Sequence, residues 1–145
     1  MHHILEKVDL ELAKQLRSMH PAQCRELLIN ACDFMSGRIS LDSELAALLT
    51  ECKSVASLIG SKQQALILYA DTADGHCFDL RDARAKATEW YPWFQRARLA
   101  TAFAKISEMP TWEDMAEGFY ELTVIFVDPS LIVEFIKRHL PEVQA

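Results

Sequence analysis

Hydrophobic residues recur at steps of three and four along most of the chain, which is the spacing of one face of an α-helix. The longest such run covers residues 79–106 and consists of Leu80, Ala83, Ala87, Trp90, Phe94, Ala97, Thr101 and Ala104. Its register continues through Pro92, a residue type that can kink or break a helix. Because Tyr91 would be a poor cap for a new helix at Pro92, the pattern predicts one long, kinked helix.

Shorter amphipathic stripes precede this central helix. They predict a helix over residues 4–18, a second from Pro21 to Gly37, and a third that Ser40 caps and Gly60 ends. Proline suits the first turn of a helix, where its missing amide costs nothing, and glycine suits the position just past the end. The first half of the chain is therefore predicted to be helical throughout.

Residues 65–70 are apolar on every side and permit two interpretations. Ser61 and Gln64 match a capping box, which favours a helix. The pair Asp74-Gly75 is a favoured hairpin turn, so a strand with a small hairpin near residues 65–80 is the alternative. The capping box and the helix-forming alanines make the helix our prediction.

After the central helix, Thr111 is a helix cap, and Asp128-Pro129 begins a last helix that Pro141 ends. Residues 122–127 are rich in β-branched side chains, so helix and strand both stay open there. The whole pattern predicts an all-α fold, a compact bundle of about seven helices around the long, Pro-kinked central helix. We expect one helical domain over residues 1–145, with an α+β fold containing the hairpin as the alternative.

The composition is typical of an ordered globular protein, with 145 residues, 50% hydrophobic and 25% charged. No apolar stretch approaches the roughly 20 residues that span a bilayer, and charges begin at Glu6, where a secretion signal would have its apolar core. We therefore expect a cytoplasmic protein with no membrane partner. The cysteines lack CxxC spacing, so we expect free buried thiols and neither a metal nor a cofactor.

Charge is distributed unevenly along a chain whose net charge is −6. Residues 79–106 contain six basic and three acidic residues, whereas residues 107–136 contain seven acidic residues and no lysine or arginine. Asp114, Glu117 and Glu121 follow helical spacing and form one acidic row, with Glu113 beside it. This row suits a basic protein partner. The alternatives are a solvated face, or pairing with the basic central helix inside the fold.

The sequence contains none of the catalytic motifs that we looked for, which include phosphate loops, nucleophile elbows and paired histidines on one helical face. A cluster of carboxylates, imidazole and thiol at Asp71, Asp74, His76, Cys77 and Asp79 has the composition of a catalytic loop. Aspartate and glycine are also common in helix connections, so we interpret this segment as turn chemistry. We predict no catalytic residues.

Aromatic residues crowd around Pro92. The helical register assigns Trp90 and Phe94 to the core, and a kink at Pro92 would turn Tyr91 or Trp93 outward, where either could contact a partner. Aromatics among arginines also occur in nucleic-acid-binding proteins, but the net negative charge makes nucleic acid an unfavourable partner.

We therefore predict a binding protein without enzymatic activity. Small, acidic, helical chains without catalytic motifs are typical of bacterial immunity proteins, which neutralise a basic toxin or nuclease, and a row of carboxylates can occupy the place of phosphate in such an active site. The predicted partner-binding residues are Glu113, Asp114, Glu117, Glu121, Tyr91 and Trp93. One alternative is a small helical enzyme or ligand-binding protein with a pocket near Pro92, lined by Trp90, Tyr91 and Trp93. Another is a helical nucleic-acid-binding adaptor.

Overall fold

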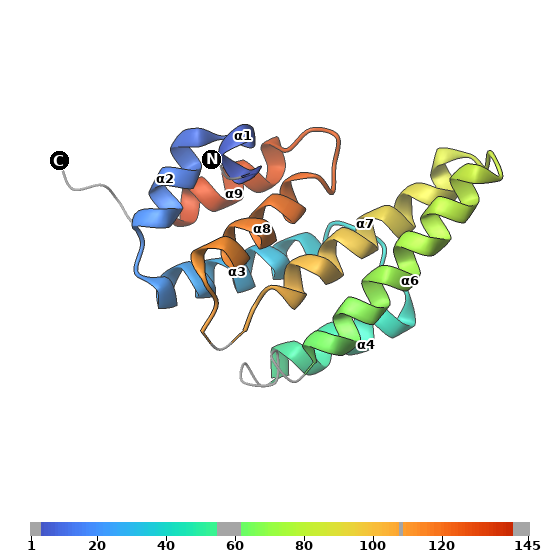
Figure 1. Cartoon of the computed structure of the whole chain (residues 1–145), viewed down its shortest axis with the longest axis horizontal. Helices are drawn as coiled ribbons and strands as arrows, with labels where there is room; N and C mark the ends of the chain where they lie inside the picture. The colour runs from blue at the N-terminus through green and yellow to red at the C-terminus, as the bar shows by residue number, and fades with distance from the viewer. Residues whose placement is uncertain (1–3, 55–61, 108, 141–145) are drawn as a thin grey trace.

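A computed structural model describes residues 4–54, 62–107 and 109–140, and all regular structure in these ranges is helical (Figure 1). The helices are α1 (Ile4–Val8), α2 (Leu10–Ser18), α3 (Pro21–Ser36), α4 (Ser43–Ser54), α6 (Gln63–Asp82), α7 (Ala87–Ala104), α8 (Trp112–Thr123) and α9 (Ser130–His139). If α1 and α2 are counted together, the described ranges contain seven helical segments. The predicted all-α bundle is confirmed. The alternative hairpin near residues 65–80 is wrong, because these residues lie inside α6.

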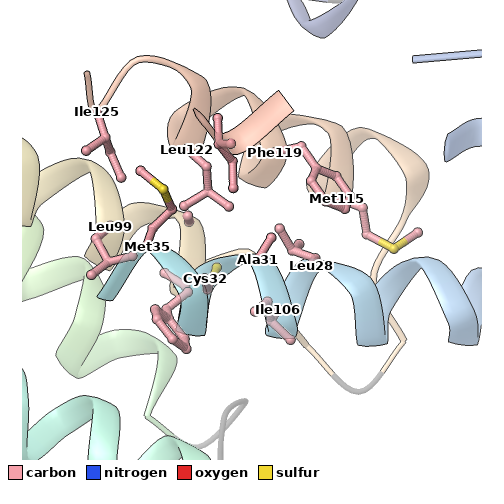
Figure 2. Close-up of a cluster of buried hydrophobic side chains, with 14 of the residues drawn as sticks. Leu28, Ala31, Cys32, Met35, Leu99, Ile106, Met115, Phe119, Leu122 and Ile125 are labelled. Carbon is pink, nitrogen blue, oxygen red and sulfur yellow. The ribbon is translucent and has the colours of Figure 1, made fainter. Parts of the chain in front are cut away.

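The core lies where α3, α7 and α8 meet (Figure 2). Its side chains are almost completely buried and include Leu28, Met35, Leu99, Phe119 and Leu122. Gly118 lets α8 approach α3 closely, because a Cβ atom there would lie 2.9 Å from Leu28 Cδ2. Helix α1 packs on α8, and α9 packs on α3.

Helices α6 and α7 form an antiparallel pair that projects beyond the rest of the bundle (Figure 1). The chain reverses between them at Arg84, which has a left-handed φ of 59°. The helix predicted over residues 79–106 therefore begins only at Ala87, and residues 79–82 belong to α6, a correction to the sequence-based boundary. Only the second half of α7 is buried in the core, from Ala97 to Ala104, because the first half belongs to the helix pair that projects beyond the rest of the bundle (Figure 1).

Pro92 lies inside α7, so the predicted continuity of the helix through this residue is confirmed. The amide that proline lacks would have donated to the carbonyl group of Thr88, four residues earlier. Thr88 is exposed near the start of α7, where water can reach that carbonyl group. The exposed position explains why the helix tolerates the proline.

Helix caps account for two further differences from the predicted boundaries. Asp9 interrupts the helix expected over residues 4–18, because its carboxylate accepts a hydrogen bond of 3.0 Å from the Leu12 amide and caps α2. Asp42 caps α4 in place of Ser40, with a bond of 2.8 Å from the Leu45 amide. The other Asp42 oxygen accepts from the Tyr69 hydroxyl at 2.8 Å and ties α4 to α6. Gly60 and Ser61 lie outside the described residues.

The second half of the chain begins its helices as predicted. Thr111 Oγ1 accepts a hydrogen bond from the Asp114 amide at 3.1 Å, and Asp128 Oδ1 accepts one from the Ser130 amide at 2.9 Å. Residues 122–127, for which helix and strand both stayed open, complete α8 at Thr123 and then form turns. No helix in the described ranges is long and apolar enough to cross a membrane.

Candidate functional site

One face of α7 lies beside α6 along its length and beside α8 only from Arg98 onward. We call the groove along this face the α7 groove and define its floor by Phe94, Arg98, Thr101 and Lys105, which follow helical spacing. It contains two cavities. The first, of about 600 Å³, is lined by Phe94 and by Asp74, Cys77, Phe78, Arg81 and Asp82 of α6. The second, of about 320 Å³, lies two turns further along α7 beside Thr101 and Lys105, and is lined also by Ile67 and Asp71 of α6 and Asp114 of α8.

Between the two cavities, Arg98 bridges all three helices. Its guanidinium donates to Asp74 Oδ2 of α6 at 2.6 Å and to Glu121 Oε2 of α8 at 2.8 Å. The side chains of Arg98 and Glu121 are only 21% and 16% exposed, whereas that of Asp74 is 47% exposed. Within the described part of the chain, the buried Nε of Arg98 has no hydrogen-bond partner. The bridge therefore fixes the width of the groove at its centre.

Burial and charge act in opposite directions on the two most buried members of this bridge. Burial raises the pKa of Glu121, and the Arg98 charge lowers it only in part, so the pKa of Glu121 stays above its ordinary value. Burial would lower the pKa of Arg98, but Glu121 and Asp74 outweigh burial and raise it. Burial is the largest influence on the Glu121 carboxylate, and the nearby Asp74 charge acts in the same direction.

The predicted acidic row forms the α8 wall of the groove. Glu121 binds Arg98, and Glu117 binds Lys105 Nζ at 2.7 Å, so two of its carboxylates pair with the basic residues of α7. Asp114 lines the second cavity, and Glu113 is exposed one residue before it. Pairing inside the fold therefore accounts for Glu117 and Glu121, while Asp114 and Glu113 keep carboxylates that have no ion pair in the described structure.

The groove carries more negative than positive charge. Three cations, Arg81, Arg98 and Lys105, lie among six carboxylates, namely Asp71, Asp74, Asp82, Asp114, Glu117 and Glu121. Two apolar side chains at its α6 edge are exposed, Phe78 at 70% and Ile67 at 40%. An acidic groove edged by exposed apolar groups has the chemistry of a binding surface.

Tyr91 and Trp93 point to different parts of the molecule. The Tyr91 hydroxyl donates to the Ile125 carbonyl at 2.7 Å and ties α7 to the segment after α8. The Trp93 ring lies 4.7 Å from that of His76 and 4.7 Å from the Arg96 guanidinium, and it packs partly on the core. These side chains do not converge on one pocket at Pro92.

The core assignment of Trp90 and Phe94 is wrong. Both are half-buried, because they lie on the projecting part of α7. Trp90 is stacked under the Arg81 guanidinium at 4.7 Å, and Phe94 lines the first cavity. Helical spacing correctly predicted that both residues lie on one face of the helix. That face meets only one neighbouring helix, so its side chains are only partly buried.

The cluster interpreted as a loop, from Asp71 to Asp79, is also helix and lies within α6. On this helix Asp74 binds Arg98, His76 contacts Trp93, and Cys77 lines the first cavity at 6% exposure. Burial raises the pKa of the Cys77 thiol, which makes the thiolate scarce and the side chain a weak nucleophile. Among the described residues, no group of three or more histidine, cysteine or acidic side chains could hold a metal ion.

The sequence interpretation missed the α6 wall. Ile67, Asp71, Asp74 and Phe78 step by four, three and four residues, which places them along one face of a helix. That signal was present in the sequence, but it becomes visible only if α6 is extended through Asp74-Gly75.

The cysteines offer a direct test of the open first cavity. None of the four cysteines forms a disulfide and all are buried, but Cys77 is 6% exposed whereas Cys24, Cys32 and Cys52 are at most 1% exposed. Burial also raises the pKa of Cys24 to about 11. We expect a maleimide to modify Cys77 first in the native protein, as read by mass spectrometry of peptides. Cys77→Ser should remove this first modification, and prior reaction of another described cysteine would contradict an open cavity.

None of the family models, curated proteins or solved structures compared with this chain matches it. Fold and site together define an all-α protein with a projecting helix pair and an acidic groove along that pair.

Proposed function

We propose that this is a macromolecule-binding protein without catalytic activity and that its partner is a basic protein held in the α7 groove. The supporting observation is the excess of carboxylates in a groove that also exposes Phe78 and Ile67. Complementary charge accelerates association and selects the partner, and the exposed apolar groups supply area to bury. The net charge of −6 acts in the same direction at long range.

In its more specific form, the proposal is a cytoplasmic bacterial protein of the immunity or antitoxin type, which neutralises a basic toxin or nuclease. Carboxylates would take the place of substrate phosphates and block the active site. Asp71 and Asp114 are the side chains best suited to this role, because they line the second cavity and form no ion pair in the described structure. The acidic groove does not favour nucleic acid as a partner, because its carboxylates would repel phosphates.

The proposal predicts that Asp71→Lys combined with Asp114→Lys weakens partner binding by about 100-fold, which corresponds to about 2.7 kcal/mol. The partner is first captured from the native host on the immobilised wild-type protein and identified by mass spectrometry. Affinities of the purified partner for wild type and variant are then measured by calorimetry at two salt concentrations. If the partner is a toxin, the variant should also fail to inhibit it.

The matched control is Glu11→Lys combined with Glu134→Lys, which changes the net charge equally at exposed positions of α2 and α9. This control should bind with nearly wild-type affinity, because only long-range attraction changes. Equal losses in the two double variants would show that net charge and not the groove attracts the partner. Capture of acidic or neutral proteins alone would also count against the proposal.

A further inference from the structure

We infer that the occupant of the α7 groove is an amphipathic α-helix of the basic partner, with an apolar side chain in the first cavity and a lysine or arginine seven residues away in the second. This inference rests on the proposed function and adds the form of the partner segment. It follows from the spacing of the cavities, from the aromatic rings in the first lining and the two carboxylates without a described ion pair in the second, and from the bridge between them.

The spacing of the two cavities fits a helix. Phe94 in the first cavity and Thr101 in the second are seven residues apart on α7, which is about 10.5 Å at 1.5 Å per residue. A helix lying along α7 repeats the same distance between its own residues i and i+7, which share one face. In an extended strand, residues on one face are separated by about 6.6 or 13.2 Å, and neither distance matches.

The first cavity is suited to an apolar anchor. Phe78 is 70% exposed at its rim, Phe94 forms its floor, and its volume of about 600 Å³ can hold a large side chain. The charged side chains of this lining are Asp74, which binds Arg98, Arg81, which is stacked on Trp90, and Asp82. An aromatic or leucine side chain placed here would bury the exposed ring of Phe78, the kind of contact that dominates protein interfaces.

The second cavity is suited to a cation. Asp71 and Asp114 lie on its two walls, and Lys105 on its floor already binds Glu117. The exposed side chain of Ile67 can pack against the methylene groups of an entering lysine or arginine. Between the cavities, Arg98 holds Asp74 and Glu121, so the partner needs only a short side chain at this point.

Two synthetic peptides test the inference. Each is a capped, alanine-rich helix of about 18 residues with the same composition. In the matched peptide phenylalanine and arginine are seven residues apart and share a face, whereas in the shifted peptide they are five residues apart and point about 140° away from each other. Both orders of the two residues are made, and binding to the full chain is measured by fluorescence anisotropy.

Of the two matched peptides, the one that binds more tightly should bind at least about tenfold more tightly than the shifted peptide with the same residue order. Phe78→Ala and Asp71→Lys/Asp114→Lys should each abolish this preference, and Glu11→Lys/Glu134→Lys should retain it. Equal binding of the matched and shifted peptides overturns the inference, as does the absence of binding up to about 1 mM. A preference that survives Phe78→Ala overturns it as well.

The outcomes also separate this inference from the proposed function. If both peptides bind equally and the groove variant weakens both, the groove takes basic chains in a form other than a helix, and only the inference fails. If light scattering shows self-association that Asp71→Lys/Asp114→Lys removes, the occupant is a second copy of this chain, and the inference fails. If no basic protein is captured from the host, the proposed function fails regardless of the peptides.

Discussion

Phe119→Ala is expected to lower the free energy of unfolding by about 3–5 kcal/mol. Phe119 lies on α8 with 0% exposure, in the cluster that joins α3, α7 and α8 (Figure 2). Removal of the ring loses its transfer free energy and leaves a cavity that the surrounding leucine and methionine side chains fill only in part. Because a domain of this size has a total stability of about 5–15 kcal/mol, this single change removes a large share of it.

Urea unfolding monitored by circular dichroism measures this effect, with the midpoint expected to fall at an unchanged slope. Val127→Ala is the control, because Val127 is 94% exposed and its replacement should change the free energy of unfolding by about 0.5 kcal/mol or less. A Phe119→Ala loss as small as that of the control would mean that the cluster does not form the core described here.

The fold class could be predicted from the sequence because the apolar stripes repeat with helical spacing over nearly every element. The reversal between α6 and α7 could not, because it occurs at Arg84 without glycine or proline. Conversely, Asp74-Gly75 has the composition of a turn but lies inside α6. Local turn preferences are weak compared with the packing of α6 against α7. Turn-forming residues therefore indicate neither the reversal at Arg84 nor the helical conformation at Asp74-Gly75.

The candidate site could be predicted only in part, because the sequence pattern does not show which helices pack against each other. The acidic row and the basic central helix were both visible, and the pairing of Glu117 and Glu121 with that helix was one of the expected alternatives. The α6 wall was missed because residues 71–79 were interpreted as a loop. Trp90 and Phe94 were placed in the core because periodicity identifies a face without showing whether a second layer covers it.

The second large effect is expected at the centre of the groove, where Arg98→Ala should lower the free energy of unfolding by about 2–3 kcal/mol. The change leaves Glu121 charged, 16% exposed and without its cation. The figure is below that for a fully buried pair, because Arg98 is 21% exposed and Asp74 can be hydrated at 47% exposure. Arg96→Ala is the matched control, since the Arg96 guanidinium donates to Ser40 at the surface, and should lose about 1 kcal/mol or less.

The pH dependence of this loss identifies its cause. Burial raises the pKa of Glu121, and in Arg98→Ala the opposing charge is absent, so the pKa rises further. The folded variant then binds a proton before the unfolded chain does as the pH falls, which raises its free energy of unfolding relative to wild type. The deficit should therefore shrink from neutral pH toward the ordinary glutamate pKa of 4.5. A deficit that is constant over this range would indicate lost packing and not an unpaired charge.

A double variant distinguishes two roles of Glu121, the positioning of α8 against α7 and direct contact with the partner. Arg98→Met combined with Glu121→Leu removes both buried charges and should lie within about 1 kcal/mol of wild type, because burying two charges recovers little net free energy. If this variant also keeps the partner affinity of wild type, Glu121 serves to position α8 against α7, and the carboxylates that meet the partner are those at the cavities on either side. A large loss of affinity at unchanged stability would instead place Glu121 itself in the interface.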